Sequence, residues 1–99
     1  MTLKISPQDR QQILIDWYRR YLFNEITQGE LLLYLRKNIL GLSQQKYAEL
    51  VGISRRTLTD IEQNKGSQTQ QIIDKVFKPL GLKAGLTLTH EHVVHKLFE

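Results

Sequence analysis

Residues 43–64 constrain the fold more than any other part of this chain of 99 residues. Their pattern predicts two short helices joined by a tight turn at Gly52, because glycine adopts a positive φ without strain. Ala48 is small enough to let the two helices touch, and Ser54 stands where a serine would cap the second helix. The segment therefore predicts two helices packed against each other at a steep angle.

The second of these helices has two chemically different faces. Leu58 and Ile61 face inward at i, i+3 spacing. The outer face carries the basic and hydrogen-bonding side chains Arg55, Arg56, Thr59 and Asp60. A helix with such an outer face fits the major groove of B-form DNA. The pattern therefore predicts contact with double-stranded DNA through this helix.

Length and composition favour one compact domain. The absence of cysteine excludes disulfides and thiolate metal sites. No apolar run approaches the roughly 20 residues of a membrane span. The N-terminus lacks the pattern of a signal peptide, so we expect a cytoplasmic protein without membrane contact. Residues 36–65 carry six basic side chains against three acidic ones, within a net charge of +4, which favours a polyanionic partner.

Hydrophobic spacing and capping residues predict an all-α fold, a compact bundle of about five short helices. The first helix begins with the serine–proline pair at Ser6 and ends near Phe23. A capping box formed by Thr27 and Glu30 begins the second helix, which is expected to end near Asn38.

The second half of the chain predicts three more helices and a strand. The third and fourth helices cover residues 44–51 and 55–63, and a second capping box, Ser67 with Gln70, begins the fifth. Beyond it the hydrophobic period changes to two, so residues 82–89 predict a half-buried β-strand. No other segment has the pattern of a strand. We therefore expect this one to pair with its own copy across a homodimer.

The spaced positions of the two central helices resemble the lambda-repressor-like helix-turn-helix domains of bacterial and phage regulators, also called the xenobiotic-response-element (XRE) family. The resemblance rests on LGLSQ at 40–44 and on Ala48, Gly52, Ile53, Ser54, Leu58, Ile61, Glu62 and Lys65. It implies a transcriptional regulator, in the simplest case a repressor, that binds a palindromic operator as a dimer. The expected regions are a helical extension over 1–26, the helix-turn-helix domain over 27–81, and a strand and tail over 82–99.

The predicted strand also resembles antitoxin repressors that accompany a kinase-type toxin, in which a C-terminal strand pairs across the dimer. This resemblance adds a sharper hypothesis, in which the protein regulates its own operon and binds a toxin protein. A plain phage-type or housekeeping regulator stays open. A further alternative is a protein-interaction module that keeps the fold without specific DNA binding. Catalysis is not expected, because the chain has no glycine-rich phosphate loop and no thiol nucleophile.

The outer face of the fourth helix supplies the expected base contacts. Arg55 and Arg56 are long enough to bind guanine O6 and N7 in a bidentate fork. Thr59 would touch a thymine methyl group or a phosphate. Asp60 would either accept a hydrogen bond from cytosine or pair with Arg56, and we favour the pairing because an unmatched carboxylate near phosphates is unfavourable. The expected phosphate contacts are Gln44, Lys37, Lys46, Thr57 and Lys65.

Three residues are expected to have structural roles. The resemblance implies that Glu62 pairs with a basic residue at the end of the preceding helix, which is Arg36 or Lys37 here. Tyr47 and Leu50 depart from the family pattern. They predict that another element covers the back of the third helix, and the N-terminal helix is the candidate.

Two apolar groups are candidates for a dimer or partner surface. They are Trp17 and Tyr21 in the first helix, and Leu86 and Leu88 in the predicted strand. For the aromatic pair, packing within the chain is the alternative. The tail contains His90, His92 and His95, but no cysteine or close carboxylate pair supports a metal site. We therefore expect neither a metal nor a cofactor.

Overall fold

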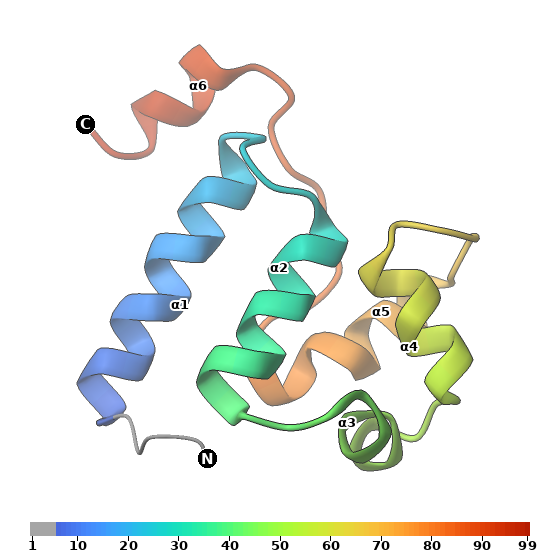
Figure 1. The fold of residues 1–99 in the computed structure, drawn as a ribbon. Helices are drawn as coiled ribbons and strands as arrows, with labels where there is room; N and C mark the ends of the chain where they lie inside the picture. Colours follow the sequence, from blue (N-terminus) through green and yellow to red (C-terminus); the bar gives the residue numbers. More distant parts are fainter. Residues whose placement is uncertain (1–5) are drawn as a thin grey trace.

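A computed structural model describes residues 6–99, which form six α-helices and two short turns of other helix types (Figure 1). In chain order they are α1 Pro7–Leu22, α2 Gln28–Leu35, the π-helical turn η1 Arg36–Leu40, α3 Gln44–Val51, α4 Arg55–Glu62, α5 Gln70–Phe77, the 3-10 turn η2 Lys78–Leu80 and α6 Glu91–Lys96. The prediction of an all-helical bundle is confirmed for these residues. The short helix α6 was not expected from the sequence.

Capping side chains set the first residues of α1 and α2. The Ser6 hydroxyl accepts a hydrogen bond from the Asp9 N–H at 3.1 Å, and the predicted capping box of Thr27 and Glu30 is present. α2 changes into the π-helical turn η1 before its expected end, and Gly41, with a φ of 64°, stops the helix.

The start of α5 differs from the predicted capping box of Ser67 and Gln70. Thr69 caps this helix instead, because its hydroxyl accepts a hydrogen bond from the N–H of Ile72 at 3.2 Å. Gln70 is the first residue of the helix. A capping box requires the glutamine at the third helical position, so Gln70 stands too early to reach back to a cap.

The hydrophobic core lies between α2, α3, α4 and α5. Its largest fully buried side chains include Leu32, Leu35, Tyr47, Leu58 and Val76. The Tyr47 hydroxyl donates a hydrogen bond to the carbonyl oxygen of Val76 on α5, and burial raises the pKa of this hydroxyl. The expectation that the N-terminal helix covers α3 is therefore wrong, since α5 covers Tyr47 while Leu50 is 59% exposed.

α2 and α4 cross closely at Gly29. A Cβ atom added at this position would overlap the carbonyl oxygens of Ile61 and Glu62. The N–H of Gly29 donates to the side-chain oxygen of Asn64 at 2.9 Å, and the Asn64 amide donates to the Thr27 hydroxyl at 2.8 Å. These contacts fix the end of α4 against the start of α2.

α1 packs along α2 on the side away from α4 (Figure 1). The Trp17 ring stacks on Tyr34 of α2 with the ring centroids 3.5 Å apart, and the Arg20 guanidinium lies 4.7 Å from the centroid of Trp17. Tyr21 also packs against the core. Both aromatic candidates for a partner surface thus make packing contacts within the chain.

The predicted strand over residues 82–89 is not present, and no part of residues 6–99 forms a strand. A strand needs a neighbour to satisfy its backbone hydrogen bonds, and the bundle offers none along this segment. The N–H of Ala84 instead donates to the Asp74 carboxylate at 2.6 Å. Leu86 and Leu88 are both exposed.

α6 docks over the C-terminal end of α1 (Figure 1). Val94 is completely buried there, and the His95 ring lies 4.6 Å from the ring of Phe23. The Arg19 guanidinium lies 4.8 Å from the centroid of the Phe98 ring. This small cluster is separate from the main core. It ties the tail to α1.

Replacing Gly29 with alanine should lower the free energy of unfolding by about 1–3 kcal/mol, because the added methyl group would push α2 and α4 apart. This direction opposes the general preference of helices for alanine. Gly85→Ala is the matched control, since no atom of residues 6–99 lies within 4 Å of a Cβ built at that position. Chemical denaturation of both variants measures the effect. A Gly29→Ala variant as stable as Gly85→Ala would contradict the close crossing.

Candidate nucleic-acid interface

α3 and α4 are joined by a tight turn at Gly52. This glycine has a φ of 76°, and the N–H of Ile53 donates to the carbonyl oxygen of Ala48 at 3.0 Å. The Ser54 hydroxyl accepts from the N–H of Thr57 at 3.0 Å, which caps α4. It also donates to the Thr57 hydroxyl at 2.9 Å. The turn therefore fixes the angle at which α4 leaves α3.

α4 separates an apolar face from a polar one. Leu58 and Ile61 are buried against the core. On the opposite face Arg55 and Arg56 are exposed, and Thr59 and Asp60 are half-buried. Two guanidinium groups therefore stand at the first turn of α4, where a helix lying in a groove presents its N-terminal residues.

Arg36 and Glu62 form a buried ion pair behind this helix. The Arg36 Nε atom lies 2.6 Å from Glu62 Oε2, and Nη2 lies 3.1 Å from Oε1. The two side chains are only 4% and 3% exposed. Arg36 Nη1 also donates to the carbonyl oxygen of Leu42 at 2.7 Å. Of the two basic residues considered for Glu62, Arg36 makes the pair, and it holds the loop before α3.

Gln44 connects this buried pair to the surface. Its side-chain Nε2 donates to Glu62 Oε1 at 2.8 Å, and its Oε1 accepts from Arg55 Nε at 3.4 Å. The side chain therefore has protein partners at both ends. A continuous series of contacts runs from the buried ion pair, through the first residue of α3, to the first residue of α4.

Arg56 is held differently from Arg55. It pairs with Asp60 one turn later, with 3.7 Å between Arg56 Nε and Asp60 Oδ2. The Arg56 side chain is 89% exposed, so this ion pair is weak. The i, i+4 pairing that the sequence analysis favoured for Asp60 is present. It provides the Asp60 carboxylate with a counter-charge on the same helix face.

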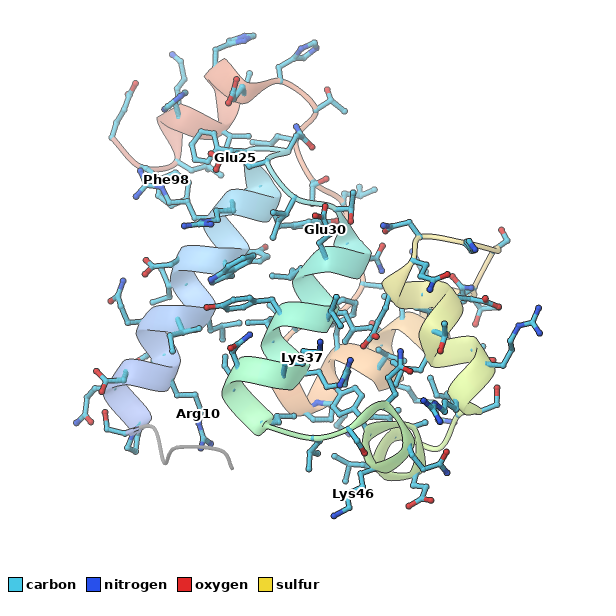
Figure 2. All side chains as sticks on the ribbon, in the orientation of Figure 1. Arg10, Glu25, Glu30, Lys37, Lys46 and Phe98 are labelled. Carbon is cyan, nitrogen blue, oxygen red and sulfur yellow. The ribbon has the colours of Figure 1, made fainter. Side chains whose placement is uncertain are left out.

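The lysines proposed for phosphate contact are all exposed. Lys37 lies in η1, Lys46 in α3, and Lys65 follows α4. Figure 2 shows the Lys46 side chain extending away from the body of the molecule. Trp17 and Tyr21 lie on α1, which is on the other side of α2 from α4 (Figure 1).

Sequence reasoning missed the second role of Gln44. Its contact with Glu62 joins residues 18 positions apart, and its contact with Arg55 spans the turn. Helical periodicity describes neighbours three and four residues apart and carries no signal for such pairs. The bond between Asn64 and Gly29, across 35 positions, was missed for the same reason.

The part of the chain that the structure describes contains no cluster of metal-ligating side chains. Within residues 6–99, no group of three or more histidine, cysteine, aspartate or glutamate side chains could hold a metal ion. The ring centroids of His90 and His92 lie 5.6 Å apart, whereas the His95 ring packs on Phe23. In the same range, no helix combines the length and the apolar character needed to cross a membrane.

Replacing Glu62 with glutamine should lower the free energy of unfolding by about 3–5 kcal/mol, because Arg36 would remain buried without a counter-charge. Asp60→Asn is the matched control. It breaks a more exposed pair and should change stability by less than about 1 kcal/mol. Urea denaturation compares the two variants. Equal effects of both changes would show that burial does not distinguish these ion pairs.

The sequence model of the helix-turn-helix family matches residues 32–86, a stretch that includes α3, the turn and α4. The matched region is more than half of the chain. No curated protein and no solved structure matches the chain. The chain therefore belongs to the helix-turn-helix family of DNA-binding regulators.

Proposed function

We propose that the protein is a sequence-specific regulator that binds double-stranded DNA, with residues 27–81 as its DNA-binding domain and α4 as the helix that enters the major groove. The observation that carries this proposal is the contact of Arg55 with Gln44, which is itself bonded to the buried Glu62. An arginine already oriented before binding loses less conformational freedom when it forms a bidentate contact.

Arg55, Arg56, Thr59 and Asp60 are the proposed base contacts. Arg55 is the first choice for a guanine. Glu62 holds the Gln44 side chain, and Gln44 in turn restricts the orientation of the Arg55 guanidinium group. Arg56 would have to leave or share Asp60, and the carboxylate would then accept from a cytosine amino group. Thr59 lies one turn from Arg55 and would meet a methyl group or a phosphate.

The proposed phosphate contacts lie on η1, on α3, on α4 itself and in the loop after α4. They are Lys37, Lys46, Gln44, Thr57 and Lys65. The side chain of Gln44 has partners within the protein, so we propose that this residue meets a phosphate through its backbone N–H at the start of α3. The Thr57 hydroxyl accepts from Ser54 and would donate its own proton to a phosphate oxygen.

A single module of this size buries too little surface for tight and specific binding. Two copies with their recognition helices about 34 Å apart would bind a palindrome, and occupancy of an operator would repress transcription. We therefore propose a homodimeric repressor. An antitoxin that regulates its own operon and binds a toxin protein is the sharper version of this hypothesis.

The alternative is a protein-interaction module that does not bind DNA specifically. The Asp60 carboxylate on the outer face of α4 favours it, because negative charge repels phosphates. The pair with Arg56 offsets this objection. Selection of bound sequences from a random DNA pool separates the two functions. A symmetric consensus supports the regulator, and binding without a consensus supports the interaction module.

Arg55→Ala should weaken binding to the selected consensus by roughly 5- to 150-fold, which corresponds to loss of one bidentate base contact. Arg10→Ala is the matched control, since Arg10 is an exposed arginine on α1, which lies across α2 from α4 (Figure 2). Binding titrations at one fixed salt concentration measure both effects. If Arg10→Ala weakens binding as much as Arg55→Ala, then α4 does not provide the specific contacts.

Lys65→Ala should weaken binding to consensus and random duplexes by the same factor, because a phosphate contact carries no sequence information. The slope of log affinity against log salt should fall by about 1. Titrations at several salt concentrations test this. A loss confined to the consensus would instead place Lys65 at a base edge.

A further inference from the structure

A largely uncharged groove of about 500 Å³ lies between α1, α5 and the segment after η2. Its apolar walls come from four parts of the chain. They are Tyr18 and Tyr21 of α1, Leu31 of α2, Ile73 and Phe77 of α5, and Leu82 after η2. The groove is thus built by the N-terminal extension, the helix-turn-helix domain and the tail together.

A fully exposed leucine stands on the same face. Leu86 lines the groove, yet its side chain is completely open to solvent, and the nearby Leu88 is also exposed. Within residues 6–99, the backbone groups of residues 85–89 make no hydrogen bond. An apolar projection therefore lies beside an apolar depression, and a two-fold contact between copies requires both on the same face.

The charge of the groove favours a second copy over a charged partner. Among the described residues, Lys83 is the one charged residue that lines it, although charged residues make up 24% of the chain. In a two-fold contact a charge near the axis meets its own duplicate, and like charges in contact oppose association. A surface with a single lysine limits this repulsion to one pair of lysines.

The groove is also independent of the proposed DNA-binding face. None of its lining residues belongs to α3 or α4. One wall comes from α1, which lies on the opposite side of α2 from α4 (Figure 1). A molecule bound in the groove would therefore leave the outer face of α4 free.

We infer that this groove is the face through which two copies of the chain associate, with Leu86 of each copy entering the groove of the other. The inference rests on the proposed function for the need for two copies. It assigns the homodimer to one surface and gives a role to the exposed Leu86. It also gives a role to Tyr18 and Tyr21 of α1, which form a wall of the groove that residues 27–81 do not provide.

Sedimentation equilibrium of the full chain, between about 1 and 200 μM, tests the inference. We expect a concentration-dependent dimer for the wild type. Leu86→Glu should raise the dimer dissociation constant at least roughly tenfold, since two leucines per dimer lose their burial. Leu50→Glu is the matched control, because Leu50 is an exposed leucine on α3, outside the groove, and should change the constant less than about twofold.

Both variants should keep the wild-type thermal midpoint, since neither side chain is buried in the chain. A wild type that stays monomeric over this range overturns the inference and leaves the groove to a peptide or a small molecule. Equal weakening by Leu50→Glu overturns it as well.

DNA titrations separate this inference from the proposed function. If the function and the face are both correct, Leu86→Glu should bind a half-site duplex with the wild-type salt slope, but lose at least roughly tenfold on the full palindrome. A wild type that dimerises through Leu86 but binds no duplex contradicts the function alone. If the protein binds DNA but Leu86→Glu leaves the dimer dissociation constant unchanged, only the inference is contradicted.

Discussion

The buried ion pair of Arg36 and Glu62 is the interaction on which the geometry of the molecule depends. Charges removed from water are unfavourable unless their donors and acceptors are matched, and here each one has a partner. Arg36 belongs to the turn that follows α2, and Glu62 is the last residue of α4. The pair therefore ties the last residue of α4 to the turn after α2, while the missing side chain of Gly29 permits the same end of α4 to approach the start of α2 closely.

The same carboxylate also links the core to the surface. Glu62 Oε1 accepts from both Arg36 and Gln44, and Gln44 in turn contacts Arg55. Orientation is thus passed from a buried ion pair to an exposed guanidinium group. Arg56 has only an exposed partner on its own helix, and such pairs contribute little to stability. Two adjacent arginines therefore differ in their partners, although both are exposed at the start of α4.

Local chemistry made much of this fold predictable. Serine and threonine caps, the capping box at Thr27 and the turn at Gly52 each act within a few residues, so their sequence patterns are sufficient. Contacts between distant positions were not predictable in the same way. The strand expected over 82–89 had the correct alternation, but a strand also needs a neighbour, and residues 6–99 supply none. The role of Gln44 likewise depends on where Glu62 lies after folding.

The docking of α6 on Phe23 ties the C-terminal tail to the end of α1. The connection between η2 and α6 is exposed over residues 85–89, and its backbone makes no hydrogen bond there with any part of the chain that the structure describes. Proteases cleave segments of this kind. A single cut in it would release α6 and uncover the ring of Phe23. An uncovered aromatic surface promotes aggregation and degradation. The lifetime of the intact protein would then be governed by this link, and the stability of the helical core would not protect it.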